Sequence, residues 1–340
     1  MEKLQLGVAY HGNRLLKHVK ADMEDIAAHN MNLVVHVFTH NDMEREKKVM
    51  KEIFDVTKDN GLDIWVDNWG LGGLPGEMSH IHAYYPDIHQ KFSNGEINPL
   101  GVCFNSNDYV EFTKRWIEAV KEAGANKIFW DEPHLHERKD GTYACCCDRC
   151  KRLFEERYGE KMPTLANEKV REFQAWTIKN YFAKVTEYSH SLGMENISCL
   201  MIRSLKFMDG ITSLPYMDNI GIDPYWVVGE KTNDPYEFVY ERSRECLDIM
   251  KEKKKDSHIW LMTFGNKARH EDEIYLAAEA AYDAGARTIL SWSYRGGEAC
   301  DYKAESCNVV WNKTGDAMRR LHDRHINNML KIYRKKYNIN

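Results

Sequence analysis

Two adjacent carboxylates, Asp131 and Glu132, follow a short apolar run that begins at Lys127. An apolar run of this length is typical of a buried strand, and Pro133 cannot donate to a sheet ladder, so the strand must end at the two acids. Parallel α/β folds bind their ligands at the carboxyl ends of their strands. The pair Asp131 and Glu132 is therefore the first candidate for an active site.

Polar and aromatic residues also end the other predicted strands. Carboxylates and amides can hydrogen-bond hydroxyl groups, and aromatic rings can pack on the C–H face of a sugar. These strand ends therefore predict a polyhydroxylated ligand. The candidates for contact with it are Asp67, Asn68, Trp69, Arg203, Tyr225, Trp226, Trp292, Tyr294 and His11.

Cleavage of a glycosidic bond usually needs a second carboxylate as nucleophile or base. The available acids are Asp131, Glu132, Asp223, Asp67 and Glu298. The alternative explanation is that some of these acids, above all Asp67 and Glu298, are buried partners of Arg203 or Arg295.

Three cysteines stand close together in the pattern Cys-x-Cys-x-x-Cys, at Cys145, Cys147 and Cys150. Three thiolates at this spacing can surround one Zn²⁺, and a structural zinc site takes four ligands. Cys103 is the predicted fourth ligand, Cys146 is the alternative, and reduced thiols without a metal also stay open. Because a site of four cysteines leaves no open coordination position, the predicted zinc is structural.

Eight strand-like runs, each followed by a helical pattern or a short helix-poor segment, predict a single (β/α)8 barrel over residues 1–340. The predicted strands are Leu4–Tyr10, Asn32–Thr39, Leu62–Asn68, Lys127–Asp131, Ile197–Arg203, Asn219–Asp223, His258–Thr263 and Thr288–Trp292. The predicted helices are Ala21–Asn30, Met43–Asn60, Asp108–Ala123, Leu165–Leu192, Asp234–Lys254, Glu271–Ala284 and Gly315–Tyr333. The long connections at 69–107 and at about 133–163, the second rich in cysteine, follow strands three and four and border the acidic pair.

Composition limits the classes of function. A hydrophobic content of 43% and a charged content of 29% are typical of a globular protein, and a net charge of -5 gives no electrostatic reason to expect nucleic acid or an anionic membrane as partner. Without a leader-like or long apolar segment, the nine cysteines predict a cytoplasmic protein with free or metal-bound thiols. The predicted partner is a carbohydrate substrate, and a homo-oligomer stays open.

The Asp-Glu-Pro strand end and the cysteines together resemble the zinc-bearing β-galactosidases of glycoside hydrolase family 42. In that family, one cysteine after strand three joins a Cys-x-Cys-x-x-Cys after strand four to hold zinc. The resemblance implies that the zinc ligands are Cys103, Cys145, Cys147 and Cys150. It also implies that Glu132 is the general acid/base, with Asp131 in the place of the clan's asparagine, and that Trp292 lies under the cleaved sugar.

The resemblance fails at strand seven, where the clan has a nucleophilic glutamate and residues 260–266 contain no acid. Asp223 on strand six is the nearest substitute. The adjacent Asp131 and Glu132 also resemble the pair of N-acetylhexosaminidases, in which the aspartate orients the substrate's acetamido nucleophile and the glutamate is the acid/base. Tyr225 would then support the acetamido oxygen.

Two further classes stay open on the sequence alone. One is a barrel that binds sugar without cleaving it. The other is a metal-dependent isomerase or aldolase that uses His11, His36 or His40 with the acids.

Overall fold

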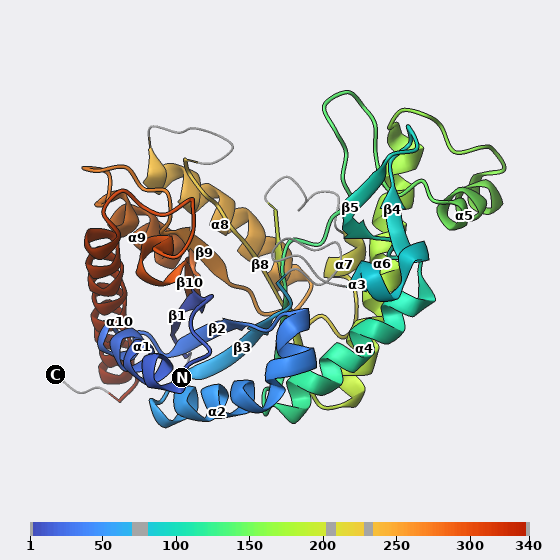
Figure 1. Cartoon of the computed structure of the whole chain (residues 1–340). Coiled ribbons are helices and arrows are strands. Elements are labelled where there is room, and N and C mark those ends of the chain that lie inside the picture. Colours follow the sequence, from blue (N-terminus) through green and yellow to red (C-terminus); the bar gives the residue numbers. More distant parts are fainter. Residues whose placement is uncertain (1–2, 70–80, 202–208, 228–233, 338–340) are drawn as a thin grey trace. The chain divides into compact units, whose positions relative to one another are not determined.

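The computed structural model describes residues 3–69, 81–201, 209–227 and 234–337 (Figure 1). Its parallel strands form a closed barrel in the order β1-β10-β9-β8-β7-β6-β3-β2. These strands are β1 (Gln5–Tyr10), β2 (Leu33–Val37), β3 (Asp63–Asp67), β6 (Lys127–Trp130), β7 (Glu195–Leu200), β8 (Asn219–Ile222), β9 (Ile259–Met262) and β10 (Thr288–Trp292). The predicted barrel is confirmed, and each predicted strand is present with ends that differ by a few residues.

Helices follow the strands along the chain. They are α1 (Leu16–Ala28), η1 (Asp42–Glu46), α2 (Lys47–Asp59), α3 (Ile81–Tyr84), η2 (Pro86–Ile88), α4 (Asn107–Glu122), α5 (Asp148–Tyr158), α6 (Glu168–Ser191), α7 (Asp209–Thr212), α8 (Pro235–Glu252), α9 (Glu273–Ala284), η4 (Tyr294–Gly297) and α10 (Cys307–Tyr337). No helix in the described ranges combines the length and the apolar character needed to cross a bilayer.

Local chemistry sets several helix ends. The side chain of Asn167 accepts from the Val170 N–H and caps α6, and Asp234 caps α8 in the same way. Gly159 and Gly285 end α5 and α9 in the left-handed conformation, which glycine adopts without a steric cost.

The last helix begins earlier than the prediction, at Cys307 and not at Gly315. Gly315 lies inside the helix, and a Cβ there would come within 2.4 Å of the His29 ring. The glycine therefore permits close packing of α10 on the end of α1 and does not mark a helix boundary.

The long connection after β3 contains an antiparallel hairpin that the sequence analysis did not predict. Its strands are β4 (His89–Lys91) and β5 (Ile97–Val102). β4 is only three residues long and mostly polar, so it shows no hydrophobic alternation from which a strand could be recognised.

The chain divides into two compact units. The first unit comprises Met1–His36, Glu52–Trp65 and Asn219–Asn340, and the second comprises Val37–Lys51 and Val66–Asp218. Each unit is described by itself below.

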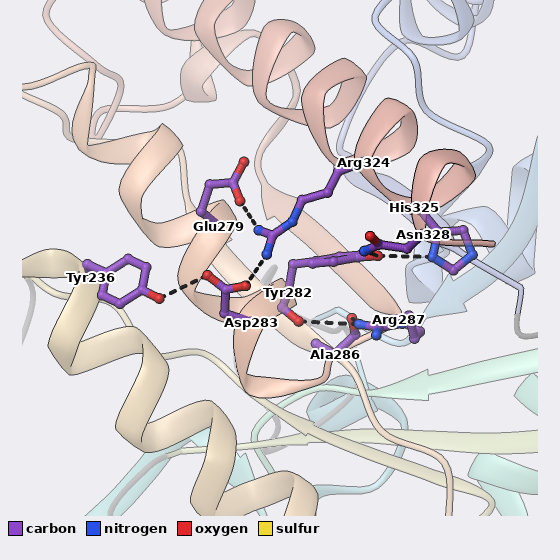
Figure 2. A network of polar contacts seen from close by, with 9 residues as sticks. All are labelled: Tyr236, Glu279, Tyr282, Asp283, Ala286, Arg287, Arg324, His325 and Asn328. Atoms are coloured by element: carbon purple, nitrogen blue, oxygen red, sulfur yellow. Dashed lines mark hydrogen bonds and ion pairs between the residues drawn. The ribbon is translucent and has the colours of Figure 1, made fainter. Parts of the chain in front are cut away.

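In the first unit, a polar network joins α8, α9 and α10 (Figure 2). Arg324 on α10 donates to both Glu279 and Asp283 on α9, and the Tyr236 hydroxyl on α8 donates to Asp283 over 2.9 Å. These groups are partly exposed, so we expect the network to orient the helices more than to stabilise them. The packing itself comes from the buried, alanine-rich face of α9.

In the second unit, stacked aromatic rings join α4 to α6. Tyr109 and Tyr181 lie parallel with their ring centroids 5.0 Å apart, and both side chains are buried. The Trp116 indole N–H donates to the Phe38 carbonyl over 2.9 Å, which attaches α4 to the segment after β2. These contacts hold the strand ends of this unit in place.

Candidate active site

The acidic pair lies directly after β6, as predicted. The strand end is fixed on the β7 side by two hydrogen bonds, from the Trp130 indole N–H to Asn196 at 3.1 Å and from the Ser198 hydroxyl to the Trp130 carbonyl at 3.0 Å. Glu132 has a positive φ of 33°, which is uncommon for a residue with a side chain. Such backbone strain persists where the surrounding structure holds it, and it is frequent at functional sites.

A second set of polar residues follows β3, the strand that pairs with β6. Asp67 and Asn68 are both fully buried. Neither the amide nitrogen nor the carbonyl oxygen of the Asn68 side chain has a hydrogen-bond partner among the described residues. Buried polar groups are nearly always hydrogen-bonded, so this amide points to a ligand or to water at the site.

The electrostatics of this acidic cluster, Asp67, Asp131 and Glu132, are unusual. Burial raises the pKa of Asp131 well above its ordinary value, and the charges of Asp67 and Glu132 raise it further. Burial also raises the pKa of Asp67, and a backbone hydrogen bond from Trp69 offsets part of that effect. The cluster therefore favours a proton held by a buried carboxyl group at neutral pH, which a sugar-cleaving or sugar-binding site can use as a hydrogen-bond donor.

In the first unit, Asp223 is the residue directly after β8. It is half-buried, and its carbonyl accepts from the Tyr225 N–H over 2.7 Å in a tight turn. The Tyr225 ring meets the Phe264 ring edge-on, with centroids 5.2 Å apart. Trp226 is buried, and its indole N–H donates to Glu273 over 2.8 Å, so its ring packs inside this unit.

The ends of β1 and β10 bring three predicted contact residues together. His11 meets Trp292 edge-on at 4.7 Å, and a pocket of about 260 Å³ is lined by His11, Tyr294 and neighbouring residues. Burial lowers the pKa of His11 to about 4, so its imidazole is neutral at pH 7. This pocket can offer an aromatic surface and neutral hydrogen-bonding groups.

Asp22 on α1 also lines this pocket, and the sequence analysis missed it. Its carboxylate accepts from the Tyr10 hydroxyl at 2.5 Å and from the Tyr294 hydroxyl at 3.2 Å. Asp25, one helical turn later, accepts from Tyr294 at 3.0 Å. In the sequence, the spacing of Asp22 and Asp25, three residues apart and so on one face of the helix, was the pattern that could have indicated this site.

Glu298 has Arg295 as its partner, as the alternative explanation has it, since Arg295 donates to it over 2.6 Å, but this ion pair is partly exposed and not buried. Arg203 lies outside the described residues, so the proposed pairing with Asp67 stays a prediction. His36 is a core residue whose ring contacts the Thr57 hydroxyl at 2.9 Å, and His40 is buried beside Glu44.

The four predicted metal ligands form a buried cluster. The Sγ atoms of Cys103, Cys145, Cys147 and Cys150 all lie within 4.8 Å of one another. This is the one group of three or more candidate ligand atoms found within the described part of the chain. The histidines of the metal-enzyme alternative therefore form no such cluster among the described residues.

The geometry of these thiols fits a tetrahedral metal ion. Zn–S bonds of about 2.3 Å imply about 3.8 Å between sulfurs. The Cys103 sulfur lies 3.5 Å from that of Cys150 and 3.6 Å from that of Cys147. Cys146 bonds instead to the Tyr143 carbonyl, so the structure supports Cys103 and not Cys146 as the fourth member.

Surrounding contacts hold this cluster in place. The Asn105 amide donates to the Cys150 sulfur at 3.4 Å. Hydrogen bonds with Cys103, Cys145 and Cys150 lower the pKa of the Cys147 thiol. The Cys146 N–H donates to the Lys91 carbonyl over 2.7 Å, which joins the cysteine loop to the β4–β5 hairpin. The two long connections therefore meet at the cysteines.

Comparison with known proteins supports the fold. No protein-family model matches the chain. A stretch of 104 residues is 33% identical to the β-galactosidase BgaA of Clostridium cellulovorans, and it covers 28% of this chain and 15% of that protein. The chain thus spans a small part of the length of this curated relative.

Two solved structures resemble the whole chain. The β-galactosidase of the psychrophilic Marinomonas ef1 superposes with a TM-score of 0.70 at 13% identity, over 99% of this chain and 61% of that one. The catalytic domain of the β-amylase of Paenibacillus polymyxa has a TM-score of 0.64 at 9% identity, over 92% of this chain and 95% of that one. The chain therefore has the closed barrel fold that these glycoside hydrolases also have.

Proposed function

We propose that the chain is a glycoside hydrolase that acts on a short oligosaccharide or glycoside. The observation that carries this proposal is the acidic cluster after β3 and β6, with its buried carboxyl groups and the unpartnered Asn68 amide. Buried acids with raised pKa at barrel strand ends are typical of catalytic sites. The similarity to glycoside hydrolases in fold and in one short stretch of sequence adds support.

In this proposal Glu132 protonates the leaving oxygen, since it is partly exposed and follows the strand end that resembles the acid/base position. Asp131 stays protonated and donates a hydrogen bond to a hydroxyl beside the scissile bond. Asn68 hydrogen-bonds a second hydroxyl. Asp223 is the nucleophile or base.

The contacts with the sugar are assigned by chemistry. We propose that Trp292, which is 8% exposed and meets the His11 ring in a T-shaped contact, offers its exposed part to the sugar. Trp69, Tyr225 and Tyr294 are proposed as further contacts, at the ends of other barrel strands. Trp226 follows Tyr225 in the sequence, but its ring is 1% exposed, so it has little surface for direct contact with a sugar.

A substrate-assisted N-acetylhexosaminidase is the second candidate. Two observations favour it: Asp131 and Glu132 stand side by side directly after β6, and residues 260–266, at the end of β9, contain no acid that could act as nucleophile. In that reaction the acetamido oxygen of the substrate attacks the anomeric carbon, and Glu132 protonates the leaving oxygen. Inhibition by a thiazoline sugar would separate this reaction from one that uses Asp223.

A screen against nitrophenyl glycosides of galactose, glucose, mannose and N-acetylglucosamine, in both anomeric forms, tests the proposal. Release of nitrophenol from one of them is the expected result, and NMR of the first product then gives its anomeric configuration. Binding of sugars without release from any glycoside would favour the non-catalytic barrel.

We also propose that the cysteine cluster holds a structural Zn²⁺. Four thiolates satisfy the preferred coordination of zinc and leave no position for substrate, so the ion would stabilise the loops and take no part in the reaction. Zinc analysis of the purified protein is the direct check.

A further inference from the structure

A hollow of about 420 Å³ lies in the second unit, and its lining includes none of the residues proposed above for hydrolysis or for contact with the sugar. Its walls come from η1 and the start of α2, from α3 and the residue after it, and from the outer face of α4. We call it the α2–α4 groove. Its size is in the range of small-molecule sites.

One side of the groove is aromatic. Tyr84 is 65% exposed, which is unusual for a large ring, and it faces the buried His40 ring at 6.0 Å. His40 packs edge-on against Phe112 at 4.7 Å. The three rings form a fixed wall, and the exposed Tyr84 ring offers a flat apolar surface.

The rim of the groove alternates in charge. The Arg115 guanidinium is held by the Tyr85 hydroxyl at 2.8 Å and lies over the Phe112 ring. Lys47 pairs with Glu122, and Glu44 lies 3.5 Å from the His40 ring nitrogen. The rim thus presents fixed hydrogen-bond donors beside fixed acceptors, and each carboxylate keeps further acceptor capacity.

The mixed charges of the rim and the Tyr84 ring together favour one class of ligand over singly charged and purely apolar molecules. A cation would meet Lys47 and Arg115, and an anion would meet three carboxylates, Glu44, Glu118 and Glu122. A purely apolar ligand would leave these charged groups desolvated without partners. An uncharged molecule with many hydroxyl groups and one apolar face satisfies the donors, the acceptors and the Tyr84 ring together.

We propose that the α2–α4 groove is a second saccharide-binding site, separate from the acidic cluster. One sugar ring packs on Tyr84, and its hydroxyls bond to Glu44 and Arg115. Binding here does not depend on hydrolysis, so the proposal stands or fails separately from the role of Glu132. The site would hold a saccharide chain on the protein while another part of that chain is cleaved.

Isothermal titration of the Glu132→Gln protein with maltose, lactose and β-1,4-mannobiose, one at a time, tests this proposal. We expect one of them to bind the groove with a Kd of about 1 mM, as suits a shallow site. Tyr84→Ala and Glu44→Gln should each weaken this binding at least about tenfold. Tyr337→Ala is the matched control, because Tyr337 is also an exposed tyrosine but lies in the first unit, outside the groove.

Equal binding in the Tyr84→Ala and parent proteins would overturn the proposal and place the sugar elsewhere. Absence of binding by all three disaccharides at ten times the expected Kd would also overturn it. Circular dichroism of Tyr84→Ala separates lost binding from lost folding. If wild type hydrolyses no glycoside but the groove binds, only the proposed catalytic function fails.

Discussion

Asp67 and Asp131 are both buried, and the charge of Asp67 raises the pKa of Asp131 beyond the effect of burial. Asp67 is the last residue of β3 and Asp131 directly follows β6, and the two strands pair with Asp67 opposite Phe129. Two buried carboxylates on neighbouring strands disfavour a doubly ionised state. Burying both carboxyl groups costs free energy of folding. Apolar residues at these two positions would avoid that cost, so we expect the acids to serve a function.

Replacing Asp131 with asparagine should stabilise the protein. In the folded state its pKa is raised, so ionisation at neutral pH costs free energy that the unfolded chain does not lose. We expect Asp131→Asn to raise Tm by about 2 °C or more at pH 7 and to lower activity. The gain should vanish toward pH 3.8, where the unfolded aspartate also binds its proton. The exposed Asp301→Asn is the control, and a lower Tm for Asp131→Asn would contradict the account.

Removing one cysteine of the cluster should release the metal. We expect about one zinc per chain in the wild type. Cys147→Ser should lose it and lower Tm by about 5 °C or more, since metal binding contributes to folding. Cys146→Ser is a matched control in the same loop, because Cys146 bonds to Tyr143 outside the cluster. Full zinc content in Cys147→Ser, measured by mass spectrometry, would contradict the proposed site.

Acid should destabilise the protein through its buried histidines. Burial, and to a smaller extent the charge of Arg14, lowers the pKa of His36 from 6.5 to about 3. The unfolded chain therefore binds a proton below pH 6.5 that the folded chain does not, and stability falls as pH decreases from 6.5 toward 3.

His36→Phe tests this effect, because phenylalanine keeps the ring contacts with Tyr10 and Phe54 and does not titrate. Urea titrations at several pH values give the free energy of unfolding of each protein. As pH decreases below 6.5, we expect this free energy to fall less steeply in His36→Phe than in wild type, by up to about 1.4 kcal/mol per pH unit. Parallel pH profiles for the two proteins would show that His36 does not carry the effect.

Asp223→Ala should abolish hydrolysis if Asp223 is the nucleophile or base. Added azide can replace a missing carboxylate, so we expect partial recovery of activity with a glycosyl azide as product. Inversion at the anomeric carbon in that azide would identify a nucleophile. Wild-type activity in Asp223→Ala would instead favour the acetamido reaction.

The sequence predicts the barrel well, because each buried strand is a short apolar run bounded by polar residues or glycine. The predicted strands Lys127–Asp131 and Thr288–Trp292 follow this pattern, and they correspond to the barrel strands β6 (Lys127–Trp130) and β10 (Thr288–Trp292). The β4–β5 hairpin was missed because β4 consists of only three polar residues, His-Gln-Lys, and its pairing with β5 therefore leaves no hydrophobic alternation in the sequence.

The candidate site was predictable only in part. The four cysteines were found because metal chemistry restricts residue type and spacing together. Asp22 was missed because its role depends on the Tyr10 and Tyr294 hydroxyls, which are far from each other in the sequence. The burial of Trp226 was also not visible, since an aromatic residue at a strand end is equally compatible with packing and with ligand contact.

The most direct test of the central claim compares Glu132→Gln with wild type on two aryl glycosides of the same sugar, one with a good and one with a poor leaving group. A general acid assists departure of the poor leaving group far more. We therefore expect kcat to fall about 10²–10⁴-fold on the poor leaving group and much less on the good one. Equal losses on both substrates, or an activity unchanged from wild type, would contradict the assignment of Glu132 as the general acid.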